Sequence, residues 1–179
     1  MRRADRRHCL FAGLLAACGV APAQQVCGND AIAVSAPTDR FQDEGDGTVT
    51  DKDNMLMWTR CSAGQTRSAA GCSGAPAPLD WASAQGQAQA LNAGGALFFN
   101  DWRLPSVREL ATLVERRCEN PRVNLAVFPG TVADTYWTSS SRPGVGAAAG
   151  TLVLDFGARG VVFADRSEPH RLRLVRSAR

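Results

Sequence analysis

The sequence predicts an α+β domain in which two helices pack on a small, mostly antiparallel sheet with long loops and two disulfides. Two segments carry apolar residues at helical spacing, and short apolar runs separated by glycine-rich turns lie around them. Four cysteines remain once an expected N-terminal leader is set aside, an even number that favours crosslinking. A chain of 179 residues has room for one such domain.

The N-terminus resembles an export signal, and we expect residues 1–23 to be a signal peptide. Four arginines precede an apolar run from Cys9 to Ala21, and Ala21-Pro22-Ala23 supplies the small residues of a cleavage site. The run is shorter than the roughly 20 apolar residues that a permanent membrane helix needs. Residues 24–38 are then an N-terminal arm, and residues 39–179 form the domain.

A second cut competes with the first. Leu15-Ala16-Ala17-Cys18 has the pattern of a lipobox, in which Cys18 would be acylated and become the new N-terminus. Both alternatives stay open, and both predict an extracytoplasmic protein, either free in the periplasm or secreted, or lipid-anchored to the envelope. An anchor of this kind would be its one direct contact with a membrane.

Removal of residues 1–23 leaves a chain with no net charge, with 16 basic and 16 acidic residues. The basicity of the whole sequence therefore does not indicate a nucleic-acid partner. Arginines still gather near the C-terminus, and Arg171, Arg173 and Arg176 are candidates for binding an anionic polymer such as a sulfated glycan. The alternative is that they form the solvated face of a terminal strand.

The four remaining cysteines allow three disulfide connectivities. Cys61 and Cys72 flank a polar loop rich in small residues, so we expect them to pair with each other. Cys27 then pairs with Cys118. A metal site is the alternative, but the spacings are wide and no histidine lies nearby, so the sequence predicts no metal and no cofactor.

The first half of the domain predicts a β-meander followed by the cysteine loop. Phe41 starts a strand, Thr48-Val49-Thr50 forms the next, and Met55-Leu56-Met57-Trp58 forms a third. Glycine- and aspartate-rich turns separate them, because glycine tolerates the positive φ that such turns need.

Two helices follow the meander. The first covers about residues 80–92, with Asp80 as its cap and Gly94-Gly95 as its stop. Ser106-Val107-Arg108-Glu109 is a capping box that begins the second helix, which we expect to end near Cys118.

The C-terminal part returns to strands. Residues 120–135 predict an irregular loop, Tyr136-Trp137-Thr138 a core strand, and residues 143–150 a flexible loop. The segments 152–156 and 161–163 predict a hairpin, and Leu172-Arg173-Leu174-Val175 a last strand whose alternation suits one solvated face.

Several short motifs in a fixed order resemble a known family. They begin with Gly45-Asp46-Gly47-Thr48-Val49-Thr50-Asp51 and Leu56-Met57-Trp58 and continue with Asp101-Trp102-Arg103-Leu104-Pro105, Glu109-Leu110, Phe128-Pro129, Tyr136-Trp137-Thr138-Ser139-Ser140, Asp155-Phe156-Gly157 and Leu174-Val175-Arg176. Over about residues 39–176 the chain resembles the Lcl C-terminal domain family. The resemblance implies a C-type-lectin-like α+β fold, usual on exported proteins, and the founding member is an adhesin that binds sulfated polysaccharides.

Two sets of side chains carry competing interpretations. Asp43, Asp46, Asp51 and Asp53 could collect around calcium, but the EF-hand register fails and turns favour Asp for conformational reasons. The four tryptophans could stack on sugars, although each lies in an apolar segment typical of a core. In the Asp101–Pro105 motif we expect Trp102 and Leu104 inside the core, with Arg103 paired to a carboxylate or to backbone carbonyls.

The remaining polar candidates are few. Ser139 and Ser140 follow the core strand and are candidates for a polar ligand. Residues 24–179 contain a single histidine, His170, in polar company, so we expect it at the surface and predict no catalytic residue.

The leading hypothesis is therefore an extracytoplasmic binding module for a glycan or a surface protein. One rival is a secreted enzyme related to the formylglycine-generating oxidases, which share the broad fold and use cysteine thiolates and copper. Another is a structural subunit of the envelope with protein neighbours only.

Overall fold

The computed structural model describes residues 24–28, 30–69, 71–95, 97–141 and 150–178. Within them it confirms the α+β class: two α-helices, several small antiparallel sheets and two disulfides, consistent with a C-type-lectin-like fold. The expected signal peptide, the lipobox with Cys18 and nearly all of the 143–150 loop lie outside the described residues.

The predicted meander forms a four-stranded sheet with the end of the chain. Its order is β11-β4-β3-β2, with bounds Phe41–Asp43 for β2, Thr48–Asp51 for β3, Leu56–Thr59 for β4 and Val175–Ser177 for β11. Trp58 on β4 faces both Val49 and Val175 across the ladder. The last strand therefore closes the sheet beside the third strand of the meander, far away in sequence.

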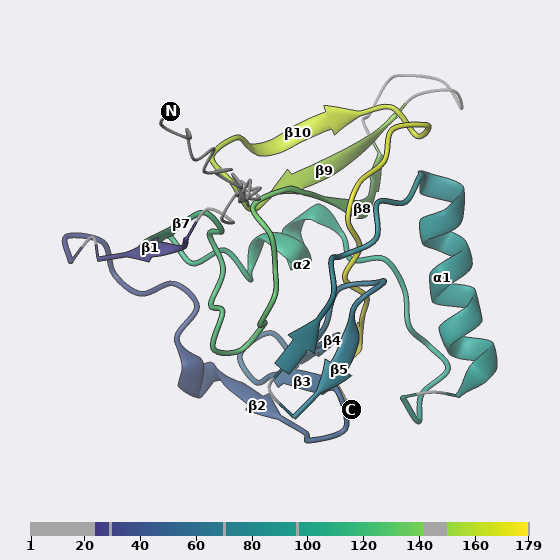
Figure 1. Ribbon diagram of the computed structural model, residues 1–179, viewed down its shortest axis with the longest axis horizontal. Helices are drawn as coiled ribbons and strands as arrows, with labels where there is room; N and C mark the ends of the chain where they lie inside the picture. The colour runs from purple at the N-terminus through teal and green to yellow at the C-terminus, as the bar shows by residue number, and fades with distance from the viewer. Residues whose placement is uncertain (1–23, 29, 70, 96, 142–149, 179) are drawn as a thin grey trace, which may run out of the picture.

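A second sheet contains the predicted core strand and hairpin. It has the order β10-β9-β8, with β8 at Thr135–Ser141, β9 at Thr151–Asp155 and β10 at Gly160–Ala164. The first four residues of β8 are buried, as an apolar strand between two packing layers requires. Figure 1 shows this sheet at the top of the molecule and the four-stranded sheet at the bottom.

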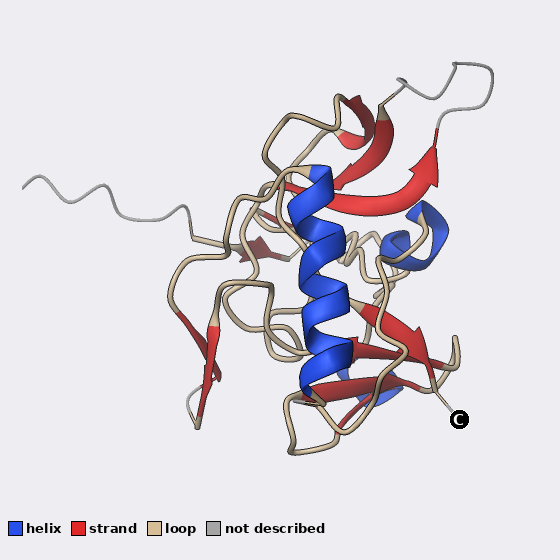
Figure 2. Cartoon of the chain, turned by 90° about the vertical axis from the view of Figure 1, so that its right-hand side faces the viewer, coloured by secondary structure: helices blue, strands red, loops and turns tan. Residues whose placement is uncertain are grey.

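Helix α1, Trp81–Gly94, runs along one side of both sheets (Figure 2). The Asp80 carboxylate accepts a hydrogen bond from the Ser83 amide at 2.7 Å, and Gly95 ends the helix in the left-handed conformation, as predicted. The helix buries only two alanines and leaves most of its polar face exposed.

Helix α2, Val107–Ala111, has the predicted capping box but not the predicted length. The expectation that it ends near Cys118 is wrong. Residues 112–114 continue as tight turns, in which each amide donates to the carbonyl three residues earlier. Val114 then forms a β-bridge to Val123, and β7, Cys118–Glu119, pairs with β1, Val26–Cys27.

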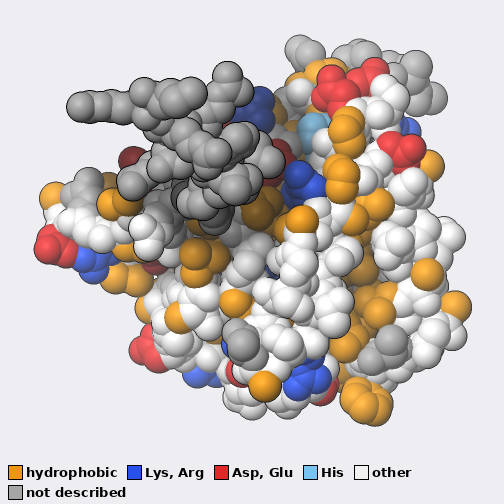
Figure 3. Space-filling model, in the orientation of Figure 1, with side chains coloured by type: hydrophobic (Ala, Val, Ile, Leu, Met, Phe, Trp, Pro, Cys, Tyr) orange, Lys and Arg blue, Asp and Glu red, His pale blue; other side chains and the backbone are white. Residues whose placement is uncertain are grey.

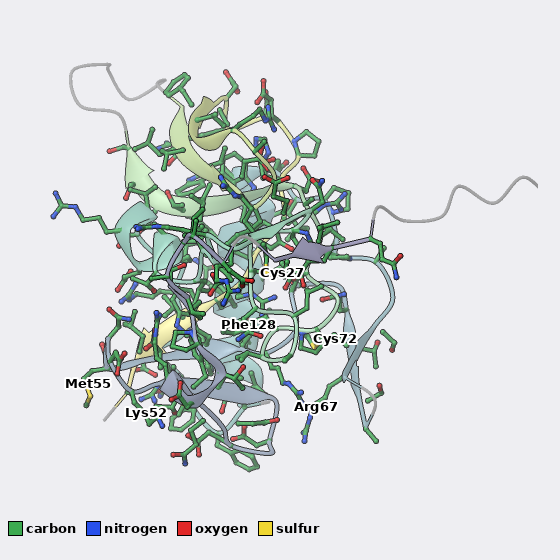
Figure 4. The ribbon with its side chains drawn as sticks, turned by 90° about the vertical axis from the view of Figure 1, so that its left-hand side faces the viewer. Cys27, Lys52, Met55, Arg67, Cys72 and Phe128 are labelled. Atoms are coloured by element: carbon green, nitrogen blue, oxygen red, sulfur yellow. A yellow bond between two sulfur atoms is a disulfide. The ribbon has the colours of Figure 1, made fainter. Side chains whose placement is uncertain are left out.

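Both expected disulfides are present, Cys27–Cys118 and Cys61–Cys72. The first ties the N-terminal arm to β7. Inside the second, the sequence predicted a plain loop, but the structure has a hairpin of β5, Thr66–Ser68, and β6, Gly71–Ser73. Figure 4 places Cys72 on this hairpin, with Arg67 extending outward from it.

The buried apolar side chains form two clusters. Phe128 lies in the larger cluster with Trp58 and Tyr136, and Figure 4 shows it near the centre of the molecule. Trp137 and Trp102 lie in the second, against α1. Neither described helix combines the length and hydrophobicity that a membrane crossing requires.

Candidate functional site

A groove of about 300 Å³ lies between α1, the Asp101–Pro105 segment and Ser139, the first exposed residue of β8. Small-molecule sites usually occupy about 300–1,000 Å³, so the groove suits a small ligand or one unit of a longer one. Its lining residues come from three separate parts of the chain: Trp81, Gln85, Ala88, Gln89, Asn92, Trp102, Arg103, Leu104 and Ser139.

One face of α1 supplies the polar wall of the groove. Trp81, Gln85 and Gln89 recur at four-residue spacing, which brings their side chains one above the other. The two glutamines are exposed, and Trp81 is half-buried with its ring edge-to-face on Trp137 at 5.4 Å. Contacts with Trp137 and with the Arg166 guanidinium, 5.3 Å from the ring centroid, hold the indole, while the amides provide donors and acceptors beside it.

The far wall is held in place by Asn92. Its side-chain amide donates to the Trp102 carbonyl at 2.9 Å, and its oxygen accepts from the Trp102 amide at 2.8 Å. These two hydrogen bonds connect the Asp101–Pro105 segment to α1. Trp102 and Leu104 are buried, as predicted. Asn92 therefore positions the groove.

Arg103 and Glu109 make the charged end of the groove electrically neutral. The guanidinium donates two hydrogen bonds to the carboxylate, at 2.9 and 2.6 Å, as predicted for Arg103. The hydrogen bonds from Arg103 hold the pKa of Glu109 at about 2, and the same bonds raise the pKa of Arg103. Since α1 has no charged residue, Arg103 is the charged residue of the groove lining, and Glu109 balances it. The exposed Arg166 adds a positive charge beside the groove, with its guanidinium 5.3 Å from the Trp81 ring centroid.

The two candidate serines have different places. Ser139 is exposed and lines the groove, and its amide donates to the Pro105 carbonyl at 2.7 Å. Ser140 instead accepts a hydrogen bond from the Val107 amide at 3.0 Å, at the first residue of α2. Ser139 is thus available to a ligand, whereas Ser140 is engaged in holding a helix end.

The structure contradicts the idea of a solvated arginine patch at the C-terminus. Arg173 is 0% exposed, and its guanidinium donates to the carbonyls of Thr59 and Arg60 and to the hydroxyls of Ser62 and Thr131. Burial lowers its pKa to about 10. The predicted alternation with one wet face fails here because those acceptors from distant segments satisfy a buried guanidinium.

The other two arginines of that set are also occupied. Arg176 is 5% exposed, donates to the Asp101 carboxylate at 2.6 Å and stacks on Phe99 at 3.8 Å. Arg171 is half-buried, donates to the Asp134 carboxylate at 2.9 Å and bonds to the Pro76 carbonyl. Each of the three arginines therefore has its own partners within the fold, and the three do not form one exposed surface.

The acidic turn does not converge on a common point. Asp51 is fully buried and accepts hydrogen bonds from Arg40 and Asn54, and Arg40 and Asn54 together lower its pKa against the effect of burial. Asp46 accepts from the amide and hydroxyl of Thr48, as turn aspartates do. Across the described residues, no three metal-ligating side chains cluster together.

The prediction that His170 lies at the surface is wrong. Its side chain is 11% exposed, its Nδ1 lies 2.6 Å from the Thr135 hydroxyl, and its ring packs on Trp137 at 4.5 Å. Burial lowers its pKa, which keeps the imidazole neutral at pH 7. It supports β8 from beneath and does not line the groove.

A second cavity, of about 240 Å³, lies on the opposite flank of α1. Gln87 and Leu91 face it from the helix, while Arg67 and the Cys61 disulfide loop form the other wall. In Figure 3 the surface over α1 is largely white and orange. The helix thus lies between two grooves whose linings are similarly apolar.

The glutamines of α1 are the residues that sequence reasoning missed. Gln85, Gln87 and Gln89 occupy every second position in a helix without charged residues. Residues four apart share a helix face, so helical periodicity applied to these polar positions would have placed Gln85 and Gln89 on one face and Gln87 on another.

Comparison with known proteins gives one family. The model of the Lcl C-terminal domain matches residues 47–176. A search of curated proteins finds no match.

Proposed function

Because the chain belongs to the Lcl C-terminal domain family, we propose that it is an extracytoplasmic binding module that holds a glycan in the groove between α1 and β8. The observation that carries the proposal is the convergence of a fixed, half-buried indole with uncharged polar side chains. An aromatic face beside amide and hydroxyl groups matches a sugar, which has apolar C–H faces and a rim of hydroxyls.

The charge balance of the groove favours an uncharged sugar over a sulfated one. Arg103 is paired with Glu109, and α1 contributes no charge. The C-terminal arginines that would attract sulfate are buried or paired within the fold. A sulfated ligand would therefore gain little electrostatic attraction from the groove lining itself, and the exposed Arg166 beside Trp81 is the nearby cation that it would meet.

Export of the chain is part of the proposal. Two disulfides and the family both indicate an extracytoplasmic location, because disulfides persist in oxidising compartments. Whether the mature chain is free or carries a lipid on Cys18 belongs to the proposal as an open choice, and the intact mass of the exported protein decides it.

The cysteines that an oxidase would need are not free thiols in this structure. Formylglycine-generating chemistry of that kind needs a cysteine thiolate, and all four cysteines in the described residues are disulfide-bonded. The residues present therefore do not fit a copper–thiolate site. Alkylation of the unreduced exported protein, followed by mass spectrometry, checks this: labelled Cys27, Cys61, Cys72 or Cys118 would revive the enzyme.

Glycan-array binding of the exported chain tests the proposal. We expect binding to neutral glycans, and a loss of at least about tenfold in affinity for Trp81→Ala and for Gln85→Ala combined with Gln89→Ala. Gln87→Ala is the matched control, because it removes the same amide from the same helix on the opposite flank. Binding that is absent, or equally sensitive to Gln87→Ala, contradicts the proposal.

A further inference from the structure

Strand β10 forms an edge of the three-stranded sheet, and its own five residues include none of the charges and prolines that usually protect an edge. Within the described residues it pairs with β9 on one side, and Figure 1 shows it outermost in its sheet. Its sequence, Gly160 to Ala164, contains no charge and no proline. Natural edge strands usually carry charges, prolines or bulges that discourage strand addition, so an unprotected edge indicates a pairing site.

The outer face of β10 is also apolar. Val161 and Phe163 alternate on one face and are each 48% exposed. Two such side chains on a five-residue strand give a partner strand an apolar surface to cover in addition to its backbone hydrogen bonds.

The charges that flank β10 complement a second copy of the same strand. Arg159 precedes the strand with a side chain that is 64% exposed, and the exposed Asp165 follows it. In an antiparallel pair of two copies centred on Val162, Arg159 of each copy faces Asp165 of the other, and Val161 faces Phe163. A register shifted by two residues loses both ion pairs, and a parallel pair places Arg159 beside Arg159.

Neither flanking residue is exhausted by its contacts within the chain. Arg159 donates through its Nε to the Asp155 carboxylate at 2.7 Å, and a guanidinium has five donors. One oxygen of Asp165 accepts from the amide and hydroxyl of Ser167, both at 2.8 Å, and the contacts with Ser167 lower its pKa. Both groups therefore remain charged and able to accept a partner across the pair.

We propose that two copies of this chain associate through antiparallel pairing of β10 with β10, which joins their three-stranded sheets into one continuous sheet. The arrangement is a closed twofold dimer, in which the same surface serves both copies. A five-residue strand pair buries little area, so the dimer is weak and concentration-dependent. Each dimer presents two copies of the α1–β8 groove, which raises the avidity for a repeating ligand.

Sedimentation equilibrium of the purified chain, from about 10 μM to 1 mM, tests this proposal. We expect a monomer–dimer equilibrium whose dissociation constant rises about tenfold in Asp165→Arg, because two ion pairs become two like-charge contacts. The charge exchange Arg159→Asp with Asp165→Arg restores opposite charges across the pair and returns the constant towards the wild-type value. Asp53→Arg makes the same charge change at an exposed site in the turn between β3 and β4 and leaves the constant unchanged.

Val161→Lys is a second, independent variant, since a lysine on the outer face should abolish the dimer while the monomer stays folded by circular dichroism. A chain that stays monomeric at 1 mM overturns the proposal. So does a dimer that survives both Asp165→Arg and Val161→Lys, because that dimer must use another surface.

Discussion

Arg173 brings a positive charge into the core, and none of the ion pairs within the described residues includes it. Two carbonyls and two hydroxyls take its terminal donors, and the Phe128 ring lies 4.7 Å from the guanidinium carbon. The side chain therefore links β4, the start of the cysteine loop and the 120–135 loop. Its removal leaves both a cavity and several buried acceptors without donors.

We expect Arg173→Ala to lower the free energy of unfolding by about 2–4 kcal/mol, measured by urea denaturation. Arg173→Lys should recover only part of the loss, because an ammonium lacks the planar fork that reaches four acceptors. Arg108→Ala, on the exposed face of α2, is the matched control and should change stability by less than about 0.5 kcal/mol. A loss below that value for Arg173→Ala would contradict this role.

Glu109 makes stability depend on pH in an acidic window. Its pKa is lowered from 4.5 to about 2 by Arg103 and by the capping box, so its contribution is complete above pH 4.5 and is lost as the pH falls towards 2. Allowing for partial exposure, we expect Glu109→Gln to cost about 1–2 kcal/mol at pH 7.

The free energies of unfolding of wild type and Glu109→Gln should therefore approach each other as the pH falls from 4.5 towards 2, which urea denaturation across pH 2–7 measures. Curves that stay parallel over this range would show that the charge of Glu109 does not provide the stability.

At the scale of elements, α1 combines a good cap with a weak interior. It contains Gly86 on an exposed turn, and a Cβ added there meets no atom within 4 Å. We expect Gly86→Ala to raise the free energy of unfolding by about 0.5–1 kcal/mol, because alanine loses less backbone entropy on folding. Thermal unfolding measures it.

Gly130→Ala is the contrasting variant. Gly130 has φ +70°, and an added Cβ would lie 2.7 Å from the Gln65 amide nitrogen, so the same substitution should destabilise the protein. Equal effects at Gly86 and Gly130 would contradict the backbone argument.

Helix ends and strand pairs mark the limit of what the sequence predicts. The caps of α1 and α2 and the hairpin of β9 and β10 follow from local chemistry, and the structure confirms them. The end of α2 does not, because Glu115 turns aside to accept hydrogen bonds from the amides of Ser35 and Ala36 in the N-terminal arm. Contacts between residues about 80 apart leave no periodic signal in the sequence.

The same limit applies to the candidate site. Trp81, Arg103 and Ser139 were singled out separately, and only the tertiary fold brings them to one groove. The prediction for Arg171, Arg173 and Arg176 was wrong because arginines that alternate with apolar residues resemble the solvated face of a strand. The acceptors that bury Arg173 come from Thr59 to Ser62 and from Thr131, which a local pattern cannot anticipate.

At the scale of the whole molecule, the two disulfides restrain the unfolded chain to different extents. The Cys27–Cys118 bond spans 91 residues and the Cys61–Cys72 bond 11. By loop-closure entropy, we expect removal of the first pair, as serines, to cost about 4.5 kcal/mol and removal of the second about 3 kcal/mol. Urea denaturation of the two double variants compares them, and a larger loss for the short loop would contradict the entropic account.

The account as a whole depends on the groove between α1 and β8 being the surface that meets the ligand. The most direct test is a nuclear magnetic resonance titration of the exported, oxidised chain with a neutral glycan selected on the array. The account predicts that the indole signal of Trp81 and the side-chain amides of Gln85 and Gln89 shift together, while the amide of Gln87 stays in place. Shifts that gather on another face of the molecule, or that leave Trp81 unmoved at saturation, would contradict it.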